Sequence, residues 1–145
     1  RLVAKEVAAR ADAFLLSTVD ALVPPDQLAA FAGAMAGADC EAGLALTAFV
    51  DDEKPLWAQL GGDGLVAAMG GRASHAHATA GLYFLTRAAA ARLPEAAAYG
   101  SLREFWIAAV AAGARVKGFV LSKTLDVDRP QDVAAAEEFL RGVKP

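Results

Sequence analysis

The amino-acid sequence predicts one α/β domain over residues 1–145, with a mainly parallel sheet, helices on both faces of that sheet and an added antiparallel β-hairpin. Short apolar runs alternate with alanine-rich helical segments, and this order is typical of parallel strands joined by helical crossovers. Near the middle of the chain, Gly62-Asp63-Gly64 separates two short segments of strand character. Glycine adopts positive φ without a steric cost, so this tripeptide favours a tight hairpin turn.

The first quarter of the chain predicts one strand between two helices. Residues 1–14 mix charged and apolar side chains as in an amphipathic helix, and residues 13–19 form a short apolar run that ends at Asp20. Two consecutive prolines ending at Pro25 favour the first turn of the next helix, which Gly37 ends. A strand with an acidic residue at its end, followed by a helix, is typical of α/β proteins.

The rest of the chain is divided by turn and capping residues. Ser101 with Glu104 three residues later forms a capping box, which marks a helix start. In chain order we expect a strand over 42–50, a polar turn over 51–55, the hairpin over 56–70, a strand over 78–86, short helical pieces to residue 98, a helix over 101–113, a strand over 115–121 and a helix over 130–141.

The composition excludes several classes of partner. The chain has 145 residues, 56% of them hydrophobic, and a formal net charge of −3 without a basic stripe, so we expect no nucleic-acid partner. No apolar run approaches the roughly 20 residues of a membrane helix, so we expect no membrane association. The single cysteine, Cys40, cannot form an internal disulfide, and the cytoplasm is the expected compartment.

Aspartates follow two of the predicted strands at their carboxyl ends. Asp20 closes the strand over 13–19, and Asp126 and Asp128 follow the strand over 115–121. The carboxyl ends of parallel strands meet at one edge of a sheet, where functional residues of α/β proteins gather. If the two strands are neighbours, these carboxylates can hold Mg²⁺, which prefers oxygen ligands. Aspartate is also a favoured helix cap and turn residue, so both interpretations stay open.

Other polar residues have two interpretations as well. Lys54 lies in the polar turn over 51–55, where it is either solvated or within reach of a phosphate. His75 and His77 would share one face of a strand, but no third metal ligand accompanies them. These 145 residues contain no glycine-rich loop followed by lysine, which excludes a P-loop within them.

Three segments, taken in order, carry a resemblance to a known family. "FLLSTVDAL" over 14–22 resembles a strand that ends in a metal-binding aspartate, and "LDVDRPQDVAAAEEFL" over 125–140 resembles a closing motif of Asp, two small residues, Thr-Pro, an acidic residue and a helix. Between them, "TAGLYFLT" follows the hairpin "LWAQLGGDGLVAAM" and resembles a strand that lines a sugar pocket. Over residues 14–140 the chain is similar to the sugar-phosphate nucleotidylyltransferase superfamily, whose fold is Rossmann-like.

The resemblance implies the transfer of a nucleoside monophosphate (NMP) from a nucleoside triphosphate (NTP) to a sugar 1-phosphate, with release of pyrophosphate. It implies that Asp20 and Asp126 are the catalytic residues that hold Mg²⁺. Asp128 stands where the family has a small residue, so it is a second ligand, a partner for Arg129 or a solvated turn residue.

The same resemblance implies a set of substrate-binding residues. Thr79, Ala80 and Gly81 would shape the sugar pocket, and Arg72 or Lys123 would meet the sugar phosphate. The implied partners are an NTP and a sugar phosphate. The sequence leaves open whether the chain forms a homo-oligomer. The sequence names neither the base nor the sugar.

Two departures from the family pattern bear on function. The family begins with a strand and a glycine-rich loop that bind the nucleotide, and neither precedes Arg1 here, so the chain resembles an N-terminally truncated member. We expect the 145 residues alone to be inactive and the full-length parent to be the enzyme. The open alternatives are a noncatalytic binding or regulatory module, or a relative that acts on the molybdenum cofactor or on an alcohol phosphate.

Overall fold

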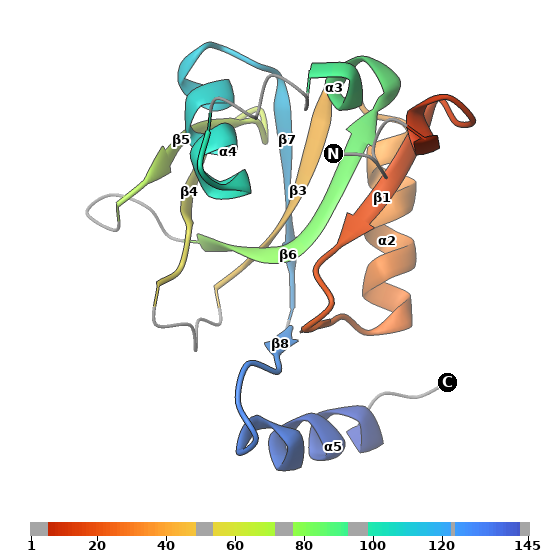
Figure 1. Ribbon diagram of the computed structural model, residues 1–145, viewed down its shortest axis with the longest axis vertical. Helices are drawn as coiled ribbons and strands as arrows, with labels where there is room; N and C mark the ends of the chain where they lie inside the picture. The colour runs from red at the N-terminus through yellow and green to blue at the C-terminus, as the bar shows by residue number, and fades with distance from the viewer. Residues whose placement is uncertain (1–5, 49–53, 72–76, 93–98, 123, 143–145) are drawn as a thin grey trace.

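A central mixed sheet organises the molecule. The computed structural model describes residues 6–48, 54–71, 77–92, 99–122 and 124–142. The central sheet has the strand order β5-β4-β6-β3-β7, and β1 pairs with β6 as well (Figure 1). The elements are β1 (Ala13–Ser17), β2 (Ala21–Leu22), α2 (Pro25–Ala36), β3 (Ala42–Thr47), β4 (Trp57–Leu60), β5 (Val66–Gly70), β6 (His77–Thr86), α3 (Arg87–Arg92), α4 (Leu102–Ala111), β7 (Val116–Leu121), β8 (Leu125–Asp126) and α5 (Asp132–Gly142).

The α/β class is confirmed, but the prediction of a mainly parallel sheet is wrong for the described residues. Among them only β3 and β7 pair in parallel, whereas β6 runs antiparallel to β1, β3 and β4. A parallel neighbour requires a long crossover connection. The chain instead reaches β6 from β3 through the β4–β5 hairpin, so that β6 returns against β3.

The directions of the strands determine where the site forms. Because β1 and β3 are both antiparallel to β6, and β7 is parallel to β3, the strands β1, β3 and β7 run in the same direction. Their carboxyl ends therefore lie at the same edge of the sheet. The segments that follow β1 and β7 meet at this edge, as predicted, because the two strands share a direction.

Helices cover both faces of the sheet, as predicted. The strand β3 is buried along its whole length, and its side chains alternate between two apolar clusters. Leu44 and Leu46 belong to the cluster that includes Trp106 of α4 and Ala90 of α3. Ala45 belongs to the other cluster, which includes Phe31 and Met35 of α2.

The predicted hairpin is confirmed. The strands β4 and β5 are antiparallel, with Trp57 opposite Gly70 and Ala58 opposite Met69. Gly64 has φ +75°, which a side chain would disfavour. The amide N–H of Leu65 donates to Oδ1 of Asp63 at 2.9 Å, so the turn is closed by an aspartate side chain.

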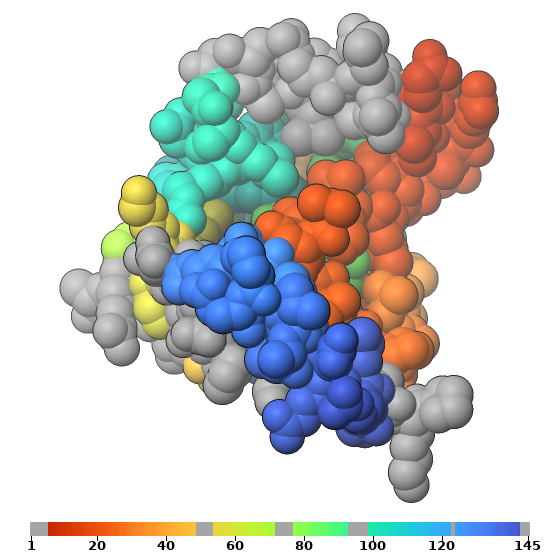
Figure 2. All heavy atoms as spheres, turned by 60° about the horizontal axis from the view of Figure 1, so that its bottom comes forward, coloured from red at the N-terminus to blue at the C-terminus, as the bar shows by residue number. Residues whose placement is uncertain are grey.

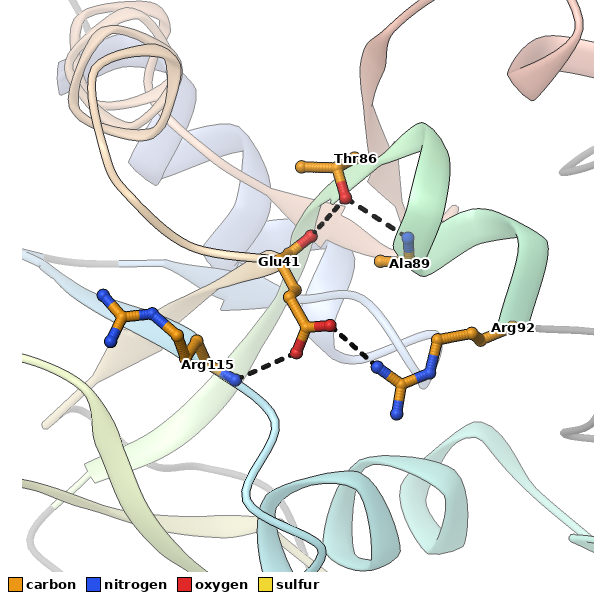
Figure 3. A network of polar contacts seen from close by, with 5 residues as sticks. All are labelled: Glu41, Thr86, Ala89, Arg92 and Arg115. Atoms are coloured by element: carbon orange, nitrogen blue, oxygen red, sulfur yellow. Dashed lines mark hydrogen bonds and ion pairs between the residues drawn. The ribbon is translucent and has the colours of Figure 1, made fainter.

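A polar network holds the amino ends of β3 and β7 at the edge opposite the aspartates. Figure 3 shows Glu41 at its centre: Arg92 Nη1 donates to Oε1 at 2.8 Å, and the backbone N–H of Arg115 donates to Oε2 at 3.1 Å. Thr86 Oγ1 donates to the Glu41 carbonyl at 2.8 Å and accepts from Ala89 N at 3.2 Å. One glutamate thus links α3, at both of its ends, to the starts of β3 and β7.

The last helix lies beyond the main sheet, next to the two-stranded ribbon β2–β8 (Figure 1). It begins at Asp132, two residues after the predicted start at Pro130. None of the helices in the described part of the chain combines the length and apolar character needed to cross a membrane.

Candidate functional site

A short antiparallel ribbon brings the two predicted catalytic aspartates together. In the pairing of β2 with β8, Ala21 lies opposite Asp126 and Leu22 lies opposite Leu125. The amide N–H of Val127 donates to the carbonyl oxygen of Asp20 at 3.0 Å. Asp20 and Asp126, which are 106 positions apart in the sequence numbering, therefore sit on adjacent backbone segments.

Gly81 allows the loop that carries Asp20 to lie against β6. The β3–β6 register shifts between Leu44 and Leu46, and Gly81 in this irregular stretch has φ +67°. Its carbonyl accepts from Thr18 N at 2.8 Å. An added Cβ would lie 2.4 Å from Thr18 Oγ1 and 2.9 Å from the Cβ of Ala21. The absence of a side chain at Gly81 thus allows the protein's own loop to lie close to β6.

Asp132 holds the loop on the other side of the site. Its Oδ2 accepts from the backbone N–H of Arg129 at 2.8 Å and of Asp128 at 3.2 Å. This is the reciprocal half of a capping box, in which an acidic side chain inside the helix reaches back to the preceding turn. Asp132 thus supports the start of the last helix, although Arg129 stands where the family motif has threonine.

These elements enclose a cavity of about 310 Å³. Figure 2 shows the surface hollowed between α4 in cyan, the segment near residue 20 in orange and the segment around β8 in blue. The lining residues come from every part of the chain that meets at this edge: Thr18, Asp20, Lys54, Leu56, Thr79, Gly81, Tyr83, Arg103, Asp126 and Asp128. The lining is mainly polar, so it suits a charged, hydroxyl-rich ligand better than an apolar one.

Carboxylates and cationic groups share this cavity. Asp20, Asp126 and Asp128 line it from the β2 and β8 side, whereas Lys54 and Arg103 line it from the segment before β4 and from α4. A ligand that carries phosphate can contact the cationic groups directly and the carboxylates through a bound cation. The distribution of charge therefore matches a phosphorylated substrate with a divalent metal.

Tyr83 forms part of the inner wall. Its side chain is buried and its ring stacks on Trp106, with ring centroids 5.8 Å apart and an interplanar angle of 12°. Burial raises the pKa of Tyr83; a hydrogen bond with Thr79 opposes the shift, and the carboxylates of Asp126 and Asp20 add to it. The phenol therefore stays protonated at neutral pH and can donate a hydrogen bond to a ligand hydroxyl.

The structure gathers most of the predicted site residues. Asp20, Asp126, Asp128, Thr79 and Gly81 all line the cavity. Ala80 does not: it is buried in the cluster beneath α2, because alternate residues of a strand point to opposite faces. The predicted phosphate contacts Arg72 and Lys123 lie outside the described residues.

Sequence reasoning did not identify Thr18, Tyr83 or Arg103 as site residues. Thr18 and Tyr83 lie in two of the segments that carry the family resemblance, close to the predicted site residues Asp20 and Gly81. Arg103 offered one signal of its own, since a cation in the first turn of a helix opposes the helix dipole and calls for another explanation.

The aspartates suit a cation that takes only part of its coordination from protein. In the described part of the chain, no three His, Cys, Asp or Glu side chains converge closely enough to hold a metal ion. Asp20 and Asp126 supply two carboxylates at one cavity, and Oδ1 of Asp126 is buried. Mg²⁺ commonly takes one or two carboxylates and completes its shell with water and substrate phosphates, so these residues fit it.

Solved structures share this fold over nearly the whole chain. The inositol-1-phosphate CTP transferase from T. maritima superposes with a TM-score of 0.77 at 23% identity, over 97% of this chain and 59% of that one. A Bacillus anthracis protein assigned as a glucose-1-phosphate thymidylyltransferase, in complex with sucrose, gives 0.75 at 14% identity, over 99% and 60%. A CMP:2-keto-3-deoxy-manno-octonic acid synthetase complexed with CTP gives 0.72 at 12% identity, over 96% and 66%.

These likenesses confirm the predicted nucleotidyltransferase fold. The chain spans 59–66% of the length of these three solved chains. No protein-family model and no curated protein sequence matches it.

Proposed function

We propose that this chain forms the acceptor side of a Mg²⁺-dependent nucleotidyltransferase, which transfers NMP from an NTP to a sugar 1-phosphate or a closely similar polyol phosphate. The observation that carries the proposal is the cavity itself. The carboxylates of Asp20, just before β2, and of Asp126 in β8 line one recess together with the cationic Lys54 and Arg103, at the carboxyl ends of β1 and β7. The nucleotidyltransferase fold supports the same conclusion.

The proposed reaction needs positioning and charge neutralisation more than covalent help from protein. A phosphate oxygen of the acceptor attacks the α-phosphorus of the NTP in line. The new P–O bond forms as the bond from the α-phosphorus to the bridging oxygen breaks, and pyrophosphate leaves with that electron pair. Bound Mg²⁺ would neutralise charge on the reacting phosphates, with Asp20 and Asp126 as its protein ligands.

The remaining lining residues suit the acceptor. Lys54 is a point charge that can bind the acceptor's phosphate. Thr79 and Tyr83 present hydroxyl groups at the cavity wall, and these can pair with hydroxyl groups of a sugar or polyol ring. Leu56 is the apolar contribution to this wall. The chemistry of the lining thus favours an acceptor that carries both phosphate and hydroxyl groups.

The test uses the complete protein, incubated with Mg²⁺, each of four NTPs and each of three acceptors, with pyrophosphate release as the readout. Inositol 1-phosphate and glucose 1-phosphate represent phosphorylated acceptors, and 2-keto-3-deoxy-manno-octonic acid represents a sugar acid without phosphate. We expect transfer to a phosphorylated acceptor, with loss of the rate when EDTA removes the metal.

Two results would contradict the proposal. Transfer to the sugar acid alone would show that the acceptor needs no phosphate group, which contradicts the proposed acceptor. The absence of pyrophosphate release with every pair, together with no thermal shift on addition of any NTP or acceptor at millimolar concentration, would indicate that the cavity serves another purpose.

A further inference from the structure

Arg103 occupies a position that helix stability does not explain. It is the second residue of α4, after the N-cap Ser101. A cation there opposes the helix dipole, so Arg103 does not stabilise the start of α4. The helix start is already satisfied, because Ser101 Oγ accepts from Glu104 N at 3.2 Å and Glu104 Oε2 accepts from Gly100 N at 2.7 Å. The arginine therefore serves a purpose outside its own helix.

The guanidinium group of Arg103 binds two consecutive carbonyl groups on a distant segment. Its Nη1 donates to the carbonyl oxygen of Pro55 at 3.2 Å, and its Nη2 donates to the carbonyl oxygen of Lys54. The rigid fork of donors in arginine suits such a paired contact, whereas lysine has a single point of attachment. Arg103 thus fixes the backbone of Lys54 from the side of α4.

The same segment is fixed from the other side by β6. Thr79 N donates to the carbonyl oxygen of Leu56 at 2.9 Å, next to the Thr79 side chain that lines the cavity. The ring of Pro55 restricts the backbone between these two attachments. Residues 54–56 are therefore held by α4 at one end and by β6 at the other.

The charge of Arg103 also acts on groups inside the cavity. Arg103 lines the cavity together with Lys54, Tyr83 and the aspartates. Its cationic group lowers the pKa of Tyr83, against the larger raising effect of burial. Arg103 therefore lies at the edge of the cavity, next to the backbone that carries the Lys54 side chain.

We propose that Arg103 is a positioning residue for the acceptor phosphate: by holding the carbonyl groups of Lys54 and Pro55, it places the Lys54 ammonium group in the cavity where that phosphate binds. This inference rests on the proposed function. It assigns to Arg103 an effect on the KM of the acceptor that operates through Lys54, and no effect on the binding of the NTP.

The experiment is a double-mutant cycle in the complete protein, with whichever of inositol 1-phosphate and glucose 1-phosphate is the better acceptor. We expect Arg103→Met to raise the acceptor KM by about 10-fold, as the loss of a charge-assisted hydrogen-bonded contact does. The KM for the NTP should change by less than about 2-fold, and kcat by less than about 3-fold. Arg103→Lys, which keeps the charge and one point of attachment, should give a smaller increase.

The second arm tests whether Arg103 acts through Lys54. In a Lys54→Met background the acceptor KM is already raised, and Arg103→Met should add less than about 2-fold. Arg115→Met is the matched control, because Arg115 Nη2 also donates to a backbone carbonyl, that of Asp39 at 2.9 Å, at the opposite edge of the sheet. This control should leave the acceptor KM unchanged.

The outcomes separate this inference from the function on which it rests. If the wild-type protein transfers NMP but Arg103→Met leaves the acceptor KM unchanged, or raises it equally with and without Lys54, the positioning role is refuted and the function stands. If the wild-type protein transfers nothing, both fail. Should Arg103→Met not fold, Arg103→Lys replaces it in the cycle, with the same absence of further effect expected in the Lys54→Met background.

Discussion

The packing around Gly81 allows one substitution to be predicted in detail. Gly81→Ala places a methyl group 2.4 Å from Thr18 Oγ1 and 2.9 Å from the Cβ of Ala21, distances at which atoms must move. The backbone at residue 81 also has φ +67°, which disfavours any side chain. The substitution therefore strains the backbone and pushes the loop that carries Asp20 away from β6.

The magnitude follows from these two effects. A left-handed backbone costs a non-glycine residue about 1–2 kcal/mol, and insertion of a methyl group into a packed position costs about 1–3 kcal/mol. We expect Gly81→Ala to lower the free energy of unfolding by about 2–5 kcal/mol. Adding Thr18→Ala removes the nearest clashing atom but leaves the backbone strain, so it should recover about 1 kcal/mol.

Urea unfolding followed by tryptophan fluorescence measures this change, since Trp106 is buried in the native state. Gly33→Ala in α2 is the matched control, because an added Cβ there meets nothing within 4 Å. That helical substitution should stabilise the protein by about 0.5–1 kcal/mol. The reasoning is refuted if Gly81→Ala stays within about 0.5 kcal/mol of the wild-type value.

Three further predictions concern the walls of the cavity. Asp20→Asn or Asp126→Asn should lower kcat of the complete protein by at least about 100-fold through weaker metal binding. Asp26→Asn on the surface of α2 is the control and should leave kcat unchanged. Near-normal rates in both site variants would show that these aspartates do not hold the metal. Asp132→Ala loses two hydrogen bonds to backbone N–H groups, so it should lower the free energy of unfolding in urea by about 1–2 kcal/mol and weaken Mg²⁺ binding. The control Glu138→Ala, at an exposed position of the same helix, should do neither. Equal effects of the two substitutions would contradict the capping role of Asp132. Because burial above all raises the pKa of Tyr83, the native state holds the phenolic proton more tightly than the unfolded chain, and the associated stability is complete below about pH 10 and lost above it. Unfolding free energies measured from pH 8 to 11 should therefore fall less steeply for Tyr83→Phe than for the wild type, and parallel curves would refute the shift.

Local sequence signals determined much of this protein. The capping box of Ser101 and Glu104 is confirmed by hydrogen bonds between residues no more than four apart. The hairpin turn at Gly64 and the strand that precedes Asp20 were predictable for the same reason, since turn conformation and strand periodicity depend on near neighbours. The aspartates at the carboxyl ends of β1 and β7 followed from the order of these elements.

The tertiary structure alone decided how these elements meet. Strand direction at β6 depends on pairing partners far along the chain, so alternation of helices and strands did not predict its antiparallel course. The missing Cβ of Gly81 makes room for Thr18, which is 63 residues away in the numbering, and local patterns did not predict this contact. Arg103 reaches Lys54 across a separation of 49 residues. Such contacts depend on the three-dimensional arrangement of the whole sheet, which no local pattern encodes.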